Sequence, residues 1–221
     1  NLVGEVVRNF TLTLWNTYSF FVTYANLDKW SPDNSVLPQF NALDNWLLSA
    51  LNTLVRDVTK AYETYDVLGA TRPIEKFVDQ LSNWYLRRSR RRYWKSESDA
   101  DKAAAYETLY QALTTVAKLL APAMHFLAEE MYQNLVLSFD PKAPVSVHLA
   151  EWPHADPSII DESLNSQMDL VMKLASLGHA ARNLSSVKVR QPLSEVAFAL
   201  GSVEDARVFE QFKDVLADEL N

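Results

Sequence analysis

Apolar side chains recur every three or four residues through most of the first 138 positions, which is the spacing of one helix face. A first helix is predicted from the start of the sequence to about Asp28, and a second begins at Asn41 or Asp44, whose side chains can cap a helix. Their apolar faces are Val3, Val7, Phe10, Leu14, Tyr18, Phe21 and Ala25 for the first, and Leu43, Trp46, Leu47, Ala50, Leu51, Leu54, Val58, Ala61, Tyr62 and Tyr65 for the second.

Glycine and proline divide the next stretch. Gly69 fits a turn, and a third helix that starts at Thr71 or Arg72 would carry Pro73 in its first turn, where a missing N–H is tolerated. A fourth helix follows a break at 96–99, and Pro122 predicts a kink or a split in it. Their apolar faces are Ile74, Phe77, Val78 and Leu81, and then Ala103, Tyr106, Tyr110, Leu113, Ala117, Leu120, Met124, Leu127 and Met131. Four helices with short connectors indicate an antiparallel bundle.

The pattern changes after residue 138. Residues 145–149 alternate like a short strand or an extended arm, and residues 196–200 have the pattern of a strand. A long helix is expected over about 161–184, and an acidic amphipathic helix over 203–220. We therefore predict a mainly α protein with a helical bundle over 1–138 and, over 139–221, a connector with extended segments, a long helix and a terminal helix. A small extended or β appendage lies toward the C-terminus in this prediction.

Composition excludes several kinds of chemistry. The chain has no cysteine, and its four histidines have no metal-binding spacing, so we expect no disulfide and no metal site. Four glycines do not make a phosphate-binding loop, no GxSxG motif occurs, and we expect no catalytic residue. No signal-like or membrane-spanning stretch is present, so a soluble protein is expected. The start at Asn1 is more typical of a piece of a longer chain.

A run of basic residues stands out from a chain whose net charge is −7. Residues 87–95 contain five arginines and one lysine without an acidic residue, and a concentrated positive site on an acidic body selects where a polyanion binds. At about 100° per residue from Ile74, Arg88 and Arg92 fall within about 40° of the core direction. The opposite face would hold Arg87, Arg90 and Trp94, with Arg91 on the flank beside Trp84 and Lys95 at the helix end.

Helical phase gives these residues two roles. Arg88 and Arg92 are expected to form a structural pair that binds acidic groups of neighbouring helices. On the outer face, arginines can contact phosphates and Trp94 can stack on an unpaired base. Two other interpretations stay open. Basic residues at a helix end complement the helix dipole, and the chain can be a structural or protein-interaction bundle whose arginines pair with its own acids.

Several segments in sequence order resemble the isoleucyl-tRNA synthetases, a family of class I aminoacyl-tRNA synthetases. The resemblance covers nearly the whole chain and is carried by residues 15–28, 81–94, 120–135, 147–153 and 189–193. Residues 18–24, Tyr-Ser-Phe-Phe-Val-Thr-Tyr, favour the isoleucyl over the related valyl and leucyl enzymes. His125 departs from the pattern, which has proline there in many relatives, and this puts the local kink in doubt.

This resemblance implies an anticodon-binding segment, with the catalytic and editing domains elsewhere in the parent enzyme. The parent would use ATP and Mg²⁺ to activate isoleucine and transfer it to tRNA, whereas this segment would hold the anticodon stem-loop and be inactive alone. Its expected partners are the isoleucine-accepting tRNA and the rest of the synthetase chain, in a cytoplasmic monomer that binds no membrane. The residues expected to contact tRNA are Arg87, Arg90, Arg91, Trp94, Lys95, Arg182, Lys188 and Arg190.

Overall fold

The chain forms two compact units, Asn1–Ile160 and Asp161–Asn221. The computed structural model describes residues 2–33, 36–96, 98–188 and 190–220. The compact units divide after Ile160, whereas the sequence pattern placed the division after residue 138. Residues 139–160 belong to the first unit because they fold back onto its helices.

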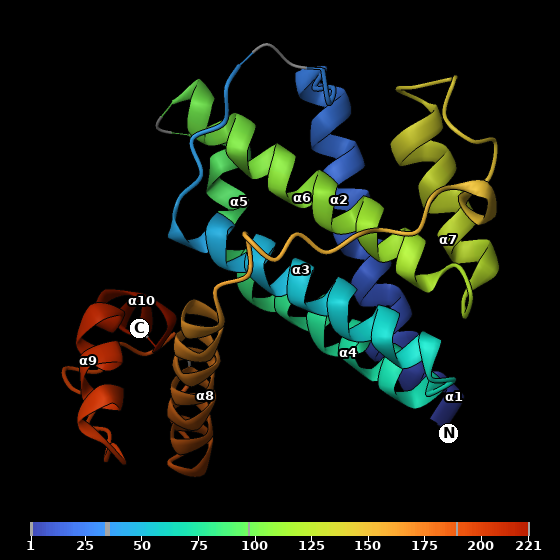
Figure 1. Cartoon of the computed structure of the whole chain (residues 1–221). Helices are drawn as coiled ribbons and strands as arrows, with labels where there is room; N and C mark the ends of the chain where they lie inside the picture. The colour runs from blue at the N-terminus through green and yellow to red at the C-terminus, as the bar shows by residue number, and fades with distance from the viewer. Residues whose placement is uncertain (1, 34–35, 97, 189, 221) are drawn as a thin grey trace. The chain divides into compact units, whose positions relative to one another are not determined.

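The described part of the first unit is mainly helical (Figure 1). Its elements are α1 (Leu2–Val6), η1 (Val7–Thr11), α2 (Leu12–Asp28), α3 (Ala42–Glu63), α4 (Val67–Asp79), η2 (Gln80–Leu86), α5 (Arg87–Trp94), α6 (Asp99–Leu120), α7 (His125–Tyr132), η3 (Gln133–Leu137) and η4 (Val147–Leu149). Here η1, η2 and η3 are π-helical segments and η4 is a 3₁₀ turn. A mainly α fold is thus confirmed.

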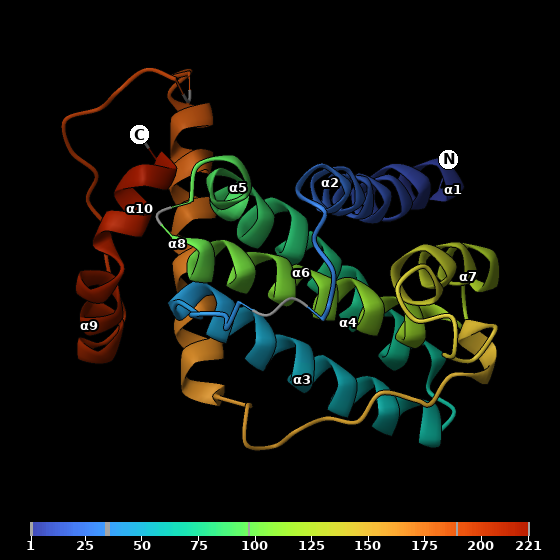
Figure 2. The same ribbon diagram turned by 90° about the horizontal axis from the view of Figure 1, so that it is seen from above.

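Helix α6 is the centre of the bundle. It packs against α2, α3, α4, α5 and α7, and Figure 2 shows it between α2 and α3. Alanines on α6 allow close approach of its neighbours, while Leu109 and Leu113 are completely buried. An aromatic cluster around Tyr106 fills one end of the same interface. Tyr106 stacks on Trp30 at 5.5 Å and contacts the edge of Tyr93 at 4.8 Å.

The helix ends follow local chemistry. The predicted start of α3 is confirmed, because Asn41 accepts hydrogen bonds from the N–H groups of Leu43 and Asp44 while Asp44 accepts from Asn41 in return. The predicted start of α4 is wrong. Asp66 caps it through the N–H of Gly69, so the helix begins at Val67 and contains Pro73. The predicted break at Pro122 is confirmed as a split between α6 and α7.

Among the predicted apolar positions whose side chains the structure describes, Val7 and Tyr65 are exposed. Val7 is 43% exposed and Tyr65 is 92% exposed. Val7 belongs to the π-helical segment η1, which fits an extra residue into a turn and rotates the preceding face by about 100° relative to a regular helix. Tyr65 follows the end of α3 and has a left-handed backbone (φ 60°), so it does not continue the helix face.

Residues 139–160 return along the bundle (Figure 1). The prediction of a strand or extended arm at 145–149 is wrong, because Val147–Leu149 forms the 3₁₀ turn η4. Glu129 of α7 holds this turn by accepting hydrogen bonds from the Ser146 hydroxyl and the Val147 N–H. The next segment runs antiparallel to α3. Trp152 Nε1 donates to Thr59 Oγ1 at 2.8 Å, and the Asp156 N–H donates to Asn52 Oδ1 at 2.8 Å.

The second unit contains the predicted long helix. The unit comprises α8 (Glu162–Leu184), α9 (Val203–Gln211) and α10 (Lys213–Leu220). The terminal acidic helix is therefore two helices, divided at Phe212. The prediction of a strand at 196–200 is wrong, because these residues form no regular element and the described part of the chain offers no strand for them to pair with. Across the described parts of both units, no residue is assigned to a β-strand.

Candidate nucleic-acid interface

Five of the eight residues of α5 are arginines. The helix continues directly from α4 through the π-helical segment η2, and its two buried side chains are Ser89 and Tyr93. Helical phase from Ile74 had placed Arg88 and Arg92 on the core side. The core side falls one position later, because η2 accommodates an extra residue and turns everything after it by about 100°.

This rotation sets which basic side chains face solvent. Arg87, Arg90, Arg91 and Lys95 are exposed, and Trp94 is 54% exposed. We call these five side chains the basic strip. With the core side at Ser89 and Tyr93, Arg91 rather than Arg90 lies opposite the core. No acidic residue occurs between Asp79 and residue 97, so the strip has no negative charge of its own.

Two aromatic side chains of α2 adjoin the basic strip. The Arg90 guanidinium carbon lies 5.7 Å from the centre of the Phe20 ring, and Trp94 lies 5.7 Å from Tyr24. Phe20 and Tyr24 are themselves in contact, with ring centres 4.6 Å apart. Both rings are partly exposed, so Phe20, Tyr24 and Trp94 make a row of aromatic rings, the aromatic row.

The sequence prediction did not include Phe20 and Tyr24. Their spacing of four places both on one side of α2, beside its core face. The sequence holds that signal, but nothing in it places this side of α2 against α5. Alternating cations and aromatic rings suit a single-stranded or looped nucleic acid, because phosphates pair with guanidinium groups and unpaired bases stack on rings.

Arg88 and Arg92 each contact other side chains of the first unit. The Arg88 guanidinium lies over the Trp84 ring, at 5.3 Å from its centre, a place that helical phase had given to Arg91. Arg92 binds acidic residues of two other helices. It donates to both carboxylate oxygens of Asp44 on α3, at 2.7 and 2.8 Å, and its Nε donates to Asp101 of α6 at 2.8 Å.

The surroundings of Arg92 favour its charged form. Although burial lowers it, the hydrogen bonds to Asp44 raise the pKa of Arg92 above its ordinary value. For Tyr93, burial has the opposite effect and raises the pKa of the hydroxyl. This hydroxyl donates a hydrogen bond to the Ala105 carbonyl at 2.9 Å. Both side chains thus keep a fixed protonation state through the physiological range, and α5 carries a constant positive charge.

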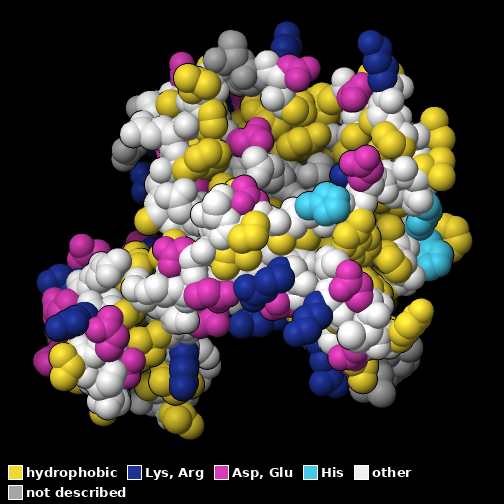
Figure 3. All heavy atoms as spheres, viewed as in Figure 1, with side chains coloured by type: hydrophobic (Ala, Val, Ile, Leu, Met, Phe, Trp, Pro, Cys, Tyr) yellow, Lys and Arg dark blue, Asp and Glu magenta, His cyan; other side chains and the backbone are white. Residues whose placement is uncertain are grey.

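A second group of basic side chains lies on α3 and α4. Figure 3 shows Lys and Arg side chains gathered over these helices, with Asp and Glu among them. Arg56, Lys60, Arg72 and Lys76 are the exposed basic residues there. Arg56 pairs with Asp57 at 2.8 Å, and both side chains are about half exposed. This surface has mixed charge, as an ordinary solvated face does, whereas the basic strip contains no acid.

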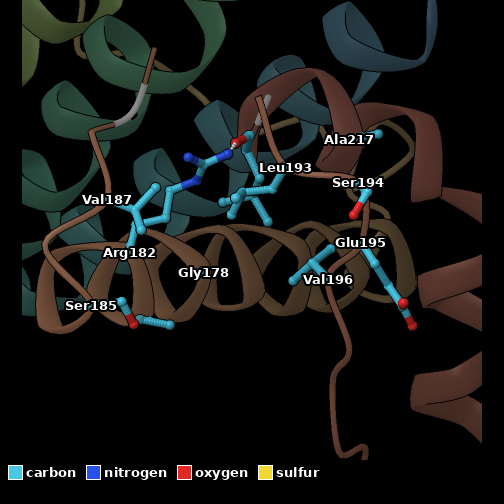
Figure 4. A pocket seen from close by; sticks show the side chains of 11 residues that line it. Gly178, Arg182, Ser185, Val187, Leu193, Ser194, Glu195, Val196 and Ala217 are labelled. Carbon is cyan, nitrogen blue, oxygen red and sulfur yellow. Dashed lines mark hydrogen bonds between the residues drawn. The ribbon is translucent and has the colours of Figure 1, made fainter. Parts of the chain in front are cut away.

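The three basic residues expected in the second unit divide into two kinds. Arg182 is 5% exposed and crosses a cavity of about 370 Å³ lined by α8, α10 and the loop between α8 and α9 (Figure 4). It donates to the carbonyl oxygens of Lys188, Gln191 and Leu220. These bonds hold its guanidinium inside the unit, so the structure gives Arg182 a structural contact with the backbone and leaves little of its side chain exposed. The Lys188 and Arg190 side chains are exposed.

Within residues 2–33, 36–96, 98–188 and 190–220, no group of three or more histidine, aspartate or glutamate side chains is arranged to hold a metal ion. Over the same ranges, no helix is both long and apolar enough to cross a bilayer.

The sequence of residues 44–197 matches the family model of the anticodon-binding domain of tRNA ligase. The match covers more than half of the chain and includes α5. The chain belongs to this family. The resemblance inferred from the sequence motifs is thereby confirmed, and the helical bundle is that of an anticodon-binding domain.

Individual relatives of the chain are isoleucine–tRNA ligases. This anticodon-binding domain is 53% identical to an isoleucine–tRNA ligase of Dehalococcoides mccartyi over 221 residues, which is 100% of the chain and 22% of the relative. It is 48% identical to the isoleucine–tRNA ligase of Thermus thermophilus over 100% of the chain, and 46% identical to that of Clostridium novyi over 99%. The chain thus spans about a fifth of the length of each of these curated relatives.

Proposed function

We propose that this domain binds the anticodon stem-loop of tRNA, and that the basic strip and the aromatic row form the contact surface. The observation that carries this proposal is the position of α5 in an anticodon-binding domain. It presents exposed cations and a half-exposed tryptophan beside two aromatic rings of α2, without an acid among them. Lys188 and Arg190 are further candidates, on the second unit.

The larger protein proposed for this chain is an isoleucine–tRNA ligase. Support comes from relatives that carry this name and match the chain over nearly all its length. ATP, Mg²⁺ and isoleucine would be used by other parts of that ligase, in the cytoplasm, and the tRNA would be one that accepts isoleucine. Holding the anticodon arm positions the acceptor end for reaction and so contributes to catalysis without a chemical step in this domain.

Salt dependence of tRNA binding tests the surface. The variant Arg87→Ala/Arg91→Ala should bind a transcript of an isoleucine-accepting tRNA more weakly than the parent chain. The slope of log K against log salt should fall by about 2, since each arginine that contacts a phosphate contributes about 1. Fluorescence anisotropy with labelled tRNA, measured between low and physiological salt, gives both quantities.

A matched control removes two arginines elsewhere on the same unit. Arg56→Ala/Arg72→Ala changes the net charge by the same amount but acts on the mixed surface of α3 and α4. Its binding and salt slope should stay close to those of the parent chain. Equal effects of the two double variants would mean that only total charge matters, and the basic strip would then not be the contact surface.

The aromatic row has its own test. Trp94→Ala should weaken binding to the tRNA and to a hairpin with the same anticodon loop, because base–aromatic stacking contributes about 1–3 kcal/mol. Binding to a fully paired RNA duplex should change little, since its bases are not free to stack. Equal losses for the hairpin and the duplex would exclude stacking on Trp94.

A further inference from the structure

Asp44 is a completely buried acidic residue that joins three elements of the first unit. Its carboxylate accepts hydrogen bonds from the Tyr85 hydroxyl at 2.7 Å, from both terminal nitrogens of Arg92, and from the Asn41 N–H at 2.9 Å. These four donors occupy the acceptor positions of a carboxylate. Asp44 therefore connects the start of α3 with η2 and α5.

Arg92 completes this connection on the α6 side. Besides the bidentate pair with Asp44, it donates through Nε to the Asp101 carboxylate and through a terminal nitrogen to the Asp101 carbonyl at 3.0 Å. The Arg92 side chain is only 12% exposed. Such a planar fork requires one orientation of the guanidinium, and a lysine does not reproduce it.

Apolar packing holds the rotation of α5 through one large side chain, Tyr93. Of its eight residues, only Ser89 and Tyr93 are buried, and Ser89 is small and polar. Arginines precede Ser89 and separate it from Tyr93, so Tyr93 is the one large side chain that α5 buries in the core. The bonds of Arg92 to Asp44 and Asp101 hold the helix at a second point, one residue before Tyr93. The π-helical segment η2 also separates α5 from the regular apolar face of α4.

We propose that Asp44 and Arg92 are positioning residues for the RNA-binding surface: they fix the rotation of α5 and so keep Arg87 and Arg91 directed to solvent. Neither residue contacts RNA in this arrangement, since Asp44 is fully buried and four N–H groups of Arg92 bond to Asp44 and Asp101. This inference rests on the proposed function of the basic strip.

Charge alone predicts the opposite sign for one variant. RNA is a polyanion, so removing a negative charge near the basic strip should strengthen binding. If Asp44 fixes the rotation of α5, Asp44→Asn should weaken binding instead, because its amide would place N–H groups against the donors of Arg92 and misalign the strip. Asp99→Asn is the matched control. It removes an exposed acid at the start of α6, and its binding should be equal or stronger.

The experiment measures binding of the whole chain to an isoleucine-accepting tRNA transcript over a salt series. All variants are kept well below their melting temperatures, as established by circular dichroism, so that loss of folded protein does not contribute. Asp44→Asn should bind about tenfold more weakly, with a salt slope lower by about 1, corresponding to one phosphate contact. Unchanged or stronger binding by folded Asp44→Asn would overturn the inference.

Arg92→Lys keeps the test decisive if Asp44→Asn does not fold. It preserves the charge but not the fork, so it should weaken binding, whereas Arg88→Lys, the same change one turn earlier, should not. Equal binding by these two variants would also overturn the positioning role. If Arg87→Ala/Arg91→Ala leaves tRNA binding unchanged, the proposed function itself fails, and this outcome is distinct from the other two.

Discussion

Replacing Arg92 by methionine tests how much the buried ion pair contributes to stability. Methionine retains an apolar stem of similar length but removes the guanidinium, which leaves Asp44 buried without its cationic partner. Removing one member of a buried pair destabilises proteins by about 3–5 kcal/mol, because the remaining charge is desolvated and unpaired. Tyr85 and Asn41 still donate to Asp44 at 2.7 and 2.9 Å. We therefore expect a loss near the lower limit, about 3 kcal/mol.

Tryptophan fluorescence during urea unfolding measures this loss in the first unit alone. The sequence has six tryptophans, all of which precede residue 161. The control is Arg91→Met, which makes the same chemical change at an exposed position and should alter the free energy of unfolding by less than about 0.5 kcal/mol.

The same series also measures the coupling between the two residues. Because Asp44→Asn and Arg92→Met disturb one shared interaction, the double variant should lose less than the sum of the single losses, by about 0.5–3 kcal/mol. Equal losses for Arg92→Met and Arg91→Met would refute the reasoning, since exposed and buried arginines would then contribute alike.

Three further predictions concern other parts of the molecule. Leu113→Ala should lower the free energy of unfolding of the first unit by about 2–5 kcal/mol in the same fluorescence assay, because Leu113 is fully buried on the central helix; a loss below about 1 kcal/mol would show that α6 is not central to the core. Arg182→Met should lower the thermal transition of the second unit in circular dichroism and leave the tryptophan transition unchanged, since the carbonyls of Lys188, Gln191 and Leu220 that it binds belong to that unit. A shift of the tryptophan transition would contradict this. Partial burial raises the pKa values of Asp28 and Glu129, but hydrogen bonds outweigh it and lower them below their ordinary values of 3.8 and 4.5, so the stability that these groups contribute is complete above about pH 5 and is lost as the pH falls through the lowered values. The melting temperature of Asp28→Asn/Glu129→Gln should therefore be lower than that of the parent at pH 7 and converge with it in acid. A difference that stays constant with pH would count against the assignment.

Local chemistry in the sequence was sufficient to place most helices. The cap at Asn41 and Asp44, the end of α2 at Asp28, the break at Pro122 and the helix from 162 to 184 depend on contacts among residues near in sequence. Side-chain caps and proline sterics act within one turn, so they can be identified without knowledge of the fold. The family could also be identified from its motifs, since several stand in the same order along the chain.

Tertiary structure decided which side chains of the basic run face solvent. A regular helical phase assigned Arg88 and Arg92 to the core side, but the π-helical segment η2 turned α5 by about one residue and buried Ser89 and Tyr93. In the same way, the π-helical segment η1 exposes Val7, although its spacing from the other apolar residues is that of a helix face. Since a π-helical turn depends on how both flanking helices pack, the apolar spacing of the chain does not reveal it.

Contacts between distant residues decided the remaining differences. The sequence determined that 87–95 is a basic, acid-free helix on an acidic protein, because charge and helical spacing are local properties. Only the fold brought Asp44 to Arg92, and Phe20 and Tyr24 to the basic strip. It also enclosed Arg182 among backbone carbonyls instead of exposing it. A buried carboxylate or carbonyl attracts an arginine only when packing brings the two together, and that proximity is a property of the tertiary structure.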